Sequence, residues 1–373
     1  MVRLRVLLAA GGTGGHIFPA IAIADEVKGR YPGAEILFVG TRREMGARLI
    51  SQAGYRLKTI TAWSLPRRLS LRTLIFPVVL VLGILQAAWI MLSYRPRVAI
   101  GTGGYASGPV LVTAWFLGIP VVIQEQNLLP GVTTRVLARI ARQVNVSFEQ
   151  SKKYLSSYHN LVVSGNPIRK EIGTVTKSKA QKKLDLDSSK KTLLVFGGSQ
   201  GANRINQALL DALEELSRAN NLQILWQTGK RDYLEVKGKM ASVTLPILLW
   251  AFIEDMASAL GAADLVIARS GATTIAELTK CGVPSILIPY PYATTGHQEQ
   301  NARVLLEAGA CCLILDKDLN GKRLAAIVTE LLNNKRKLQQ MAENSRRLAR
   351  PKAAELIVDT MINNRLIQLN FPK

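Results

Sequence analysis

Short apolar runs rich in β-branched residues alternate with helical stretches along almost the whole chain. Parallel strands covered on both faces give such runs, and the helices between them are the crossovers. The predicted strands are residues 3–9, 36–40, 98–100, 120–123, 192–196, 223–227, 265–268 and 284–288. Helices are predicted from Phe18 and over residues 203–218. The pattern therefore predicts the α/β class.

The alternation stops once and then restarts. Residues 177–191 (KSKAQKKLDLDSSKK) form a polar stretch rich in Lys and Ser, and a new strand that opens on a new glycine turn follows directly. We therefore expect two doubly wound, Rossmann-like domains, residues 1–166 and 167–350, with the boundary at an Asn-Pro pair. Residues 351–373 contain a predicted amphipathic helix, 353–369, which can pack back on the N-terminal domain.

One apolar run is much longer than a strand. Residues 74–92 (LIFPVVLVLGILQAAWIML) contain only Gln86 as a clearly polar side chain, and no Asp or Glu stands between Glu44 and Glu125. As a helix the run reaches about 28 Å, which barely crosses a bilayer. The strands before and after it belong to one predicted sheet, and a single span would divide that sheet between two sides of a membrane. We therefore expect a helix packed on the sheet.

That helix is apolar all round, whereas packing on a sheet buries only one face. The apolar face that does not pack on the sheet has two interpretations. Its basic surroundings, which include Arg67, Arg68 and Arg72, favour contact with an anionic membrane. The alternative is that another helix covers it.

Composition narrows the class of protein. The chain has 373 residues, a net charge of +22 and three cysteines, which are too few for a disulfide framework. The apolar stretch 6–10 is too short for a signal peptide, so we expect a mature cytoplasmic protein. The charge suits nucleic acid or an anionic membrane, but no base-stacking motif or basic recognition helix is present in the sequence. We therefore expect no nucleic-acid partner.

Four glycine-rich turns each follow a predicted strand. They are GGTGGH at 11–16, GTGGYASGP at 101–109, GGSQGA at 197–202 and RSGATT at 269–274. Glycine lets the backbone approach a ligand closely, and a helix N-terminus offers free N–H groups, so such turns bind phosphate. The dinucleotide fingerprint fails because Ile17 stands where its third glycine belongs, and no Gly-Lys pair continues as a Walker loop. The sequence thus predicts phosphorylated substrates, and an NAD enzyme or a P-loop NTPase is disfavoured.

Metal ligation has little support. The histidines and cysteines lack ligand spacing. Two Asp-x-Asp pairs, Asp185/Asp187 and Asp316/Asp318, are of a type that can hold Mg²⁺. The first lies in the polar stretch and the second precedes Leu-Asn-Gly, so turn or capping roles are expected instead. We expect no metal and no cofactor.

Eight motifs occur together and in order. They are GGTGGHxxPA (11–20), GTGGYASGP, EQN (125–127), GNPIR (165–169), GGSQGA, FIEDM (252–256), RSGATTxxE (269–277) and GHQxxNA (296–302). This set resembles the bacterial N-acetylglucosaminyltransferases that complete the lipid-linked peptidoglycan precursor. The resemblance implies the GT-B fold, two Rossmann-like domains facing a central cleft. It implies inverting, metal-independent transfer from UDP-GlcNAc to undecaprenyl-diphosphate-MurNAc-pentapeptide at the cytoplasmic face of the cell membrane. Anionic lipids and other cell-wall synthesis proteins are further partners in this interpretation.

The resemblance also implies a donor site in the C-terminal domain. The predicted UDP-GlcNAc-binding residues are Thr13, Gly14, Gly15, Asn127, Arg169, Ser199, Ile253, Ala272, Thr273, Thr274, Glu277 and Gln298. Within this set the backbone of Ile253 reads uracil, Glu277 accepts hydrogen bonds from the ribose and Gln298 binds the sugar. Ser199 and the turn 272–274 hold the diphosphate. The alternatives are that Glu277 is an exposed helical residue and that Gln298 is a surface residue.

Inverting transfer needs a base that takes the proton of the acceptor hydroxyl. Among the histidines, His16 lies in the first phosphate turn and is the candidate base, and binding of the acceptor diphosphate without proton transfer is its alternative role. Glu125, at a strand end, is a second candidate. The acceptor diphosphate is expected at Gly103, Gly104 and Tyr105, next to the turn 13–15. The family commonly has His where this chain has Gln124, so no role of that imidazole is transferred.

Two rival functions stay open at this point. A related transferase of the same fold would use a diacylglycerol or another polyprenyl acceptor. A nucleotide-binding module without catalysis would bind UDP but would not turn over UDP-GlcNAc.

Overall fold

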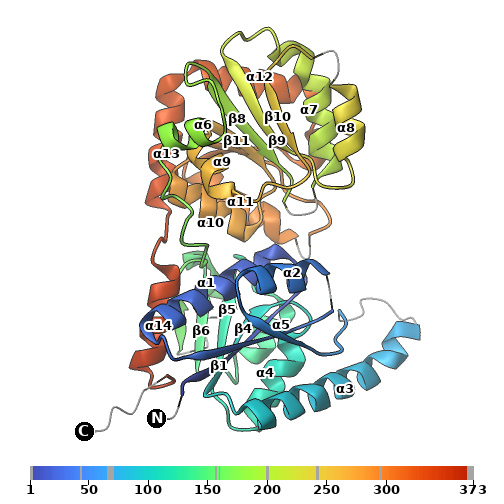
Figure 1. Ribbon diagram of the computed structural model, residues 1–373, viewed down its shortest axis with the longest axis vertical. Helices are drawn as coiled ribbons and strands as arrows, with labels where there is room; N and C mark the ends of the chain where they lie inside the picture. Colours follow the sequence, from blue (N-terminus) through green and yellow to red (C-terminus); the bar gives the residue numbers. More distant parts are fainter. Residues whose placement is uncertain are drawn as a thin grey trace. The chain divides into compact units, whose positions relative to one another are not determined.

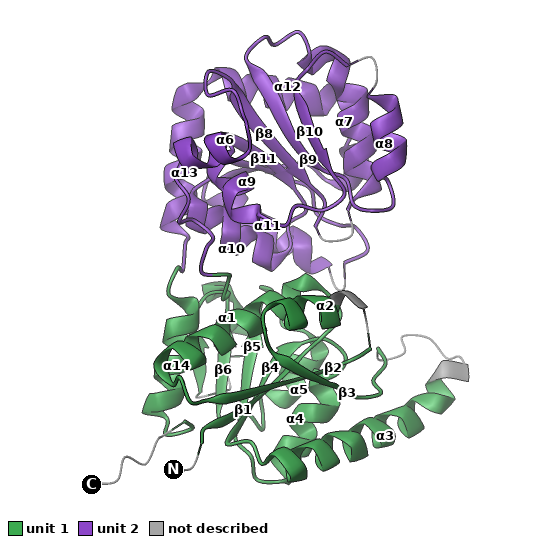
Figure 2. Ribbon diagram, viewed as in Figure 1, with its two compact units in different colours: residues 1–169, 351–373 green, residues 170–350 purple. Residues whose placement is uncertain are grey.

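The chain divides into two compact units, each built on a parallel sheet (Figures 1 and 2). This computed structural model describes residues 3–42, 44–64, 71–155, 158, 160–198, 201–240, 243–293 and 296–367. Unit 1 comprises Met1–Arg169 and Pro351–Lys373, and unit 2 comprises Lys170–Arg350. The domain boundary expected after residue 166 lies three residues before this division.

Unit 1 contains a seven-stranded sheet of order β3-β2-β1-β4-β5-β6-β7, in which every pair is parallel. Its strands are β1 (Arg5–Ala10), β2 (Glu35–Gly40), β3 (Arg56–Thr59), β4 (Val98–Gly103), β5 (Val121–Glu125), β6 (Gln143–Val146) and β7 (Leu161–Val163). Its helical segments are α1 (Gly14–Arg30), α2 (Glu44–Gln52), α3 (Leu71–Tyr94), α4 (Ser107–Phe116), α5 (Val132–Leu137), η1 (Glu149–Tyr154) and α14 (Ala353–Asn363).

The core of unit 1 lies on both faces of this sheet because side chains alternate along each strand. On β1, Val6 and Leu8 join a cluster with α1 and α14. Leu7 and Ala9 point the other way and join a cluster with α3 and α4.

Unit 2 contains a six-stranded parallel sheet of order β10-β9-β8-β11-β12-β13. Its strands are β8 (Lys191–Phe196), β9 (Leu222–Gln227), β10 (Ile247–Trp250), β11 (Leu265–Ala268), β12 (Ser285–Leu287) and β13 (Cys311–Leu313). Its helical segments are α6 (Lys177–Lys183), α7 (Asn203–Leu216), α8 (Tyr233–Lys239), α9 (Met256–Ala262), α10 (Ala272–Cys281), α11 (His297–Glu307), η3 (Asp316–Asp318), α12 (Gly321–Asn333) and α13 (Lys335–Arg347).

Both sheets are doubly wound, and in each the strand order reverses once. The reversal lies between β1 and β4 in unit 1 and between β8 and β11 in unit 2. Open α/β sheets bind ligands outside the carboxyl ends of the strands at such a point. All four glycine-rich turns follow these four strands, so the fold places each pair of turns at one switch point.

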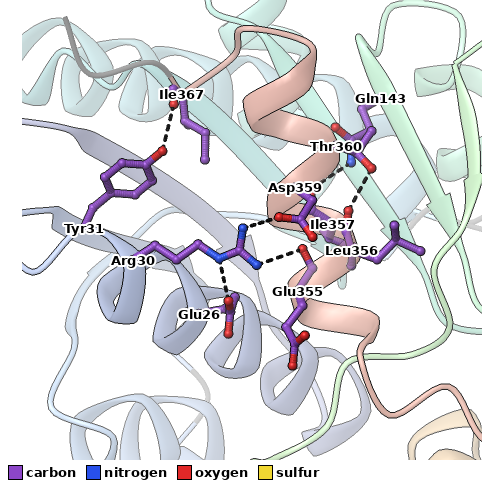
Figure 3. Close-up of polar contacts among 10 residues, drawn as sticks. All are labelled: Glu26, Arg30, Tyr31, Gln143, Glu355, Leu356, Ile357, Asp359, Thr360 and Ile367. Carbon is purple, nitrogen blue, oxygen red and sulfur yellow. Dashed lines mark hydrogen bonds and ion pairs between the residues drawn. The ribbon is translucent and has the colours of Figure 1, made fainter. Parts of the chain in front are cut away.

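Helix α14 returns from unit 2 and completes the core of unit 1 against α1 (Figure 3). Ile357, Val358 and Met361 are fully buried in the cluster that also contains β1. Figure 3 shows the guanidinium of Arg30 between the carboxylates of Glu26 and Asp359. These contacts fix the C-terminal helix on the N-terminal unit.

Helix α3 buries one face and exposes the other. Val79, Gly83, Ala87 and Met91 recur every four residues and are buried, and α4 packs beside α3. The exposed large apolar side chains of α3 are Leu74, Ile75, Val78, Leu80, Val81, Leu82, Leu85, Trp89 and Leu92. By length and composition alone Thr73–Tyr94 is able to cross a membrane, a test that core helices also pass. The basic residues Arg67 and Arg68 and the side chain of Arg72 lie outside the described residues.

Two of the predictions about elements were wrong in detail. The polar stretch 177–191 contains α6, which packs on α9 through the fully buried Ala180. The buried residues of this helix are Ala180 and Gln181, neither of which is a large apolar side chain, so the hydrophobic pattern gave little signal. Helix α1 begins at Gly14, four residues before Phe18, because the glycine turn itself supplies the first helical turn.

Candidate active site

The turns after β1 and β4 touch each other in unit 1, and glycine makes this contact possible. Gly104 has φ +85°, and a Cβ there would lie 2.3 Å from the carbonyl oxygen of Gly11. A Cβ on Gly103 would lie 2.5 Å from Nδ1 of His16. The structure therefore brings Gly103 and Gly104 together with the turn that carries His16.

The ring of His16 has a defined orientation in the first turn of α1. Its Nδ1 lies 2.9 Å from the carbonyl oxygen of Thr102 and 3.0 Å from Oε1 of Gln126. The Gln126 amide is oriented by its own Nε2, which donates to the carbonyls of Thr102 and Gln124 at 2.8 and 2.9 Å. Both neighbours of Nδ1 are therefore acceptors, and we infer that Nδ1 carries the hydrogen. The lone pair is then on Nε2, which is the arrangement that a general base requires.

Glu125, the second candidate base, is buried and accepts four hydrogen bonds. Oε1 accepts from the backbone N–H and the side-chain amide of Asn127 at 3.1 and 3.4 Å. Oε2 accepts from the backbone N–H of Gly131 at 3.1 Å and from the hydroxyl of Thr134 at 2.5 Å. This carboxylate fixes the loop that presents Asn127 and the start of α5, and its oxygens are engaged by that loop.

Gln124, which stands where the resembling family has His, is a buried structural amide. Its Nε2 donates to the Gly165 carbonyl at 3.1 Å and to the Ser147 hydroxyl at 3.3 Å, and its Oε1 accepts from the Ser164 hydroxyl at 3.3 Å. These partners follow β6 and β7, so the amide joins the ends of three neighbouring strands. An amide performs this task without an imidazole.

The other predicted residues of unit 1 lie around the same switch point. Thr13 is exposed directly before α1, and its carbonyl oxygen accepts from the N–H groups of His16 and Ile17. Tyr105 is 42% exposed after β4. The Arg169 guanidinium lies 4.5 Å from the ring centroid of Phe18, two residues beyond His16 on α1. Unit 1 thus gathers small, polar and basic groups at one edge of its sheet.

In unit 2, helix α10 carries the predicted diphosphate and ribose residues. The helix follows β11 with Ala272 and Thr273 buried in its first turn. Glu277 is only 6% exposed, which excludes its interpretation as an exposed helical residue. Burial raises the pKa of the neighbouring Cys281 thiol to about 11, and the Glu277 carboxylate adds to this rise. The thiol therefore stays protonated beside the carboxylate at neutral pH.

Gln298, in the first turn of α11, is tied to the loops on either side of it. Its Oε1 accepts from the backbone N–H of Tyr290 at 2.9 Å, and its carbonyl oxygen accepts from the hydroxyl of Ser270 at 2.8 Å. Ser270 directly precedes the turn into α10. Gln298 therefore lies half-buried beside residues 272–274, the turn predicted to hold the diphosphate.

The donor side also contains Ile253 and the turn after β8. The Ile253 N–H donates to Oε1 of Gln227 at 2.8 Å, and Nε2 of Gln227 donates to the Gly198 carbonyl at 2.8 Å. Gln227 thus connects the predicted uracil residue with the glycine turn, and it engages the N–H of Ile253. Ser199, also predicted in this turn, lies outside the described residues, as does His159.

The acidic pair Asp316/Asp318 forms the single 3-10 turn η3, in agreement with the predicted turn role. The Asp316 side chain also forms ion pairs: its Oδ1 lies 2.5 Å from the buried guanidinium of Arg269, and Arg204 approaches Oδ2 at 3.9 Å. Asp187 forms the other predicted turn, since its Oδ1 accepts from the N–H and hydroxyl of Ser189. Within the described ranges, no group of three or more His, Cys, Asp or Glu side chains is placed to hold a metal ion.

Sequence profiles of two domains cover most of the chain. The N-terminal domain of glycosyltransferase family 28 matches residues 6–146, and the C-terminal domain of that family matches residues 192–357. The chain belongs to glycosyltransferase family 28. It is therefore a glycosyltransferase, and its two parallel-sheet Rossmann-like units are those of the GT-B fold that the resemblance implied.

Within family 28 the similarity extends over the full length of named relatives. The chain is 42% identical over 368 residues to the UDP-N-acetylglucosamine--N-acetylmuramyl-(pentapeptide) pyrophosphoryl-undecaprenol N-acetylglucosamine transferase of Desulfitobacterium hafniense (strain Y51), covering 96% of this chain and 99% of the relative. A relative of the same name from Thermoanaerobacter sp. (strain X514) is 43% identical, with coverages of 95% and 98%. The crystal structure of Acinetobacter baumannii MurG superposes with a TM-score of 0.75 at 29% identity, covering 96% and 99%.

Two site residues of this family 28 member were not found by sequence reasoning. Gln126 orients His16, and Gln227 connects Ile253 to the turn after β8. Both stand at the carboxyl end of a strand, and Gln126 is the middle residue of the EQN motif, which was the only local signal for its role. Their partners come from segments distant in sequence, so their roles required the structure.

Proposed function

We propose that this glycosyltransferase moves N-acetylglucosamine from UDP-GlcNAc to the C4 hydroxyl of undecaprenyl-diphosphate-MurNAc-pentapeptide, with inversion at the anomeric carbon. The product is the lipid-linked disaccharide precursor of peptidoglycan. The observation that carries this proposal is the 42% identity over almost the whole chain to a transferase named for these two substrates.

His16 acts as the general base in this proposal. As the acceptor oxygen attacks C1 of N-acetylglucosamine, Nε2 takes the hydroxyl proton, and the bond from C1 to the UDP oxygen breaks with its electron pair leaving on UDP. The bonds from Nδ1 to Thr102 and Gln126 hold the ring in the required tautomer and stabilise the imidazolium that forms. Glu125 is a positioning residue, since its four bonds fix the loop of Asn127.

The donor is held by unit 2. The buried carboxylate of Glu277 binds the ribose hydroxyls, and the carbonyl of Ile253 is the backbone group that accepts from uracil while its N–H is engaged by Gln227. The first turn of α10, at residues 272–274, stabilises the negative charge of the leaving diphosphate through its free N–H groups and helix dipole. Gln298 binds sugar hydroxyls, and Asn127 and Arg169 of unit 1 complete the donor contacts.

The acceptor diphosphate is held by unit 1 at Gly103, Gly104 and Tyr105 and at the turn 13–15. Backbone N–H groups of two touching glycine turns, together with the start of α1, form an anion-binding edge. The undecaprenyl chain stays in the bilayer. The exposed apolar face of α3 rests on the cytoplasmic surface of the cell membrane, which makes the enzyme peripheral.

The proposal is tested by incubating the purified protein with UDP-GlcNAc and the lipid-linked MurNAc-pentapeptide. We expect UDP and a lipid-linked disaccharide in equal amounts. A diacylglycerol acceptor in the same assay is the control. Preferential transfer to diacylglycerol, or binding of UDP without turnover of UDP-GlcNAc, would contradict the proposal.

A further inference from the structure

An open cavity of about 520 Å³ lies at the edge of the unit 1 sheet opposite to the glycine turns. It is lined by the first residues of β2 and β3, the end of α1 and the end of α3, including Lys28, Glu35, Arg56, Lys58 and Tyr94. Its volume is in the range of about 300–1,000 Å³ that small-molecule sites occupy. The six residues of β1 separate this edge from His16 by about 20 Å. The cavity is therefore distinct from the active site.

The cavity carries an excess of positive charge. Its carboxylate, Glu35, is neutralised by Arg3 at 3.2 Å and by Arg5 at 3.0 Å. Lys28, Arg56 and Lys58 are exposed, and none of them forms an ion pair with an acidic side chain in the described part of the chain. Three cations thus face a common space, which suits an anionic group such as a phosphate.

The cavity also adjoins the apolar face of α3. The ammonium group of Lys58 lies 5.0 Å from the ring centroid of Trp89, which is 68% exposed. Ser93 and Tyr94, the last residues of α3, line the cavity, and Leu92 is exposed next to them. A basic site bordered by an exposed Trp and by apolar side chains matches the boundary between headgroups and acyl chains in a bilayer.

We propose that this cavity binds the phosphate headgroup of an anionic phospholipid, whose acyl chains lie along the exposed face of α3. Arg56, Lys58 and Lys28 contact the phosphate, and Trp89 and Leu92 contact the first methylenes. The bound lipid fixes the C-terminal end of α3 on the membrane. This end lies at the amino ends of the strands, on the opposite side of the sheet from the proposed acceptor site. This inference rests on the proposed placement of α3 on the membrane.

The test is cosedimentation of the full chain with vesicles of equimolar phosphatidylcholine and phosphatidylglycerol, without UDP-GlcNAc or acceptor. The double variant Arg56→Gln/Lys58→Gln should bind about tenfold or more weakly than the unmodified protein. The matched control is Lys335→Gln/Arg336→Gln, which removes one lysine and one arginine from exposed positions at the start of α13 in unit 2 and should weaken binding less than about threefold. Equal weakening in both variants would overturn the proposal, because it would indicate attraction to diffuse surface charge.

A soluble probe separates a lipid site from a general anion site. Monomeric dihexanoyl phosphatidylglycerol should bind saturably to the unmodified protein and to the control variant, and should not bind to the cavity variant. Inorganic phosphate that binds as tightly as this lipid would overturn the lipid assignment.

The activity of the three proteins is a separate control. All three should transfer N-acetylglucosamine to a water-soluble acceptor at similar rates, and loss of this activity in the cavity variant alone would contradict a site separate from catalysis. Because vesicle binding is measured without substrates, its outcome is independent of the proposed reaction.

Discussion

The two candidate bases of unit 1, His16 and Glu125, differ in how their side chains are hydrogen-bonded. His16 presents Nε2 as an acceptor because Thr102 and Gln126 both accept from Nδ1. Glu125, by contrast, has both oxygens engaged by its own loop. Of the two candidate bases, the geometry favours the histidine.

His16→Ala should lower kcat by about 10²–10⁴ and leave the affinity for UDP-GlcNAc unchanged, because the base acts in the chemical step and the donor is held by unit 2. Steady-state kinetics with a soluble acceptor and a separate donor-binding titration check this. A raised acceptor KM with kcat retained at saturation would instead assign His16 to diphosphate binding.

Gln126→Leu should lower kcat by about tenfold and leave the donor KM unchanged, because Nδ1 of His16 then loses one of its two acceptors and the ring is held less firmly in the required tautomer. The control is the double variant His16→Ala/Gln126→Leu, whose kcat should be no lower than that of His16→Ala, since Gln126 acts through the imidazole. Steady-state kinetics with a soluble acceptor check both variants. A kcat of Gln126→Leu equal to that of the unmodified protein would mean that Gln126 does not orient His16.

Glu277→Ala should raise the donor KM by about 10- to 150-fold, since losing a charged acceptor of two hydroxyls costs about 1.5–3 kcal/mol. Glu214→Ala, which removes a 90% exposed glutamate from the same unit, is the matched control and should leave the donor KM unchanged. A change confined to the acceptor KM would contradict the assignment of the donor to unit 2.

Elements with strong local patterns were predictable, and elements that depend on tertiary contacts were not. The runs that became β1, β8 and β11 are continuous and apolar, and glycine-rich turns follow them directly, so both were predictable from the sequence. Helix α6 buries only Ala180 and Gln181, and the residues of the short strand β3 are largely exposed, so neither element has a clear hydrophobic pattern. The bonds of Gln126 and Gln227 join segments far apart in sequence and required coordinates.

At the scale of α3, Leu85→Glu should shift protein from the membrane fraction to the soluble fraction, because a charge on the apolar face opposes insertion among the headgroups. Leu85 is 60% exposed, so the fold should be retained. The control, Leu234→Glu, changes a 78% exposed leucine of α8 and should not alter the distribution. Extraction of the unmodified protein only by detergent, and not by alkaline carbonate, would contradict surface binding.

The whole molecule combines two Rossmann-like units, to which the proposed reaction assigns separate substrates. In this proposal unit 1 supplies the base, the acceptor edge and the apolar helix, whereas unit 2 supplies the buried carboxylate and the helix N-terminus for the nucleotide. In unit 2 the Asp316 carboxylate is neutralised by Arg269, so one member of the acidic pair that the sequence offered for Mg²⁺ is already engaged. The proposed mechanism assigns the charge of the leaving diphosphate to the N-terminus of α10, and this assignment has a direct test.

The decisive measurement is the mass and anomeric configuration of the product formed from UDP-GlcNAc and the lipid-linked MurNAc-pentapeptide in buffer containing EDTA. The account predicts one added N-acetylglucosamine in β linkage to C4 of the MurNAc residue, at a rate that added Mg²⁺ does not change. An α-linked product, or transfer that stops in EDTA and returns with Mg²⁺, would contradict inverting catalysis by His16 and the N-terminus of α10.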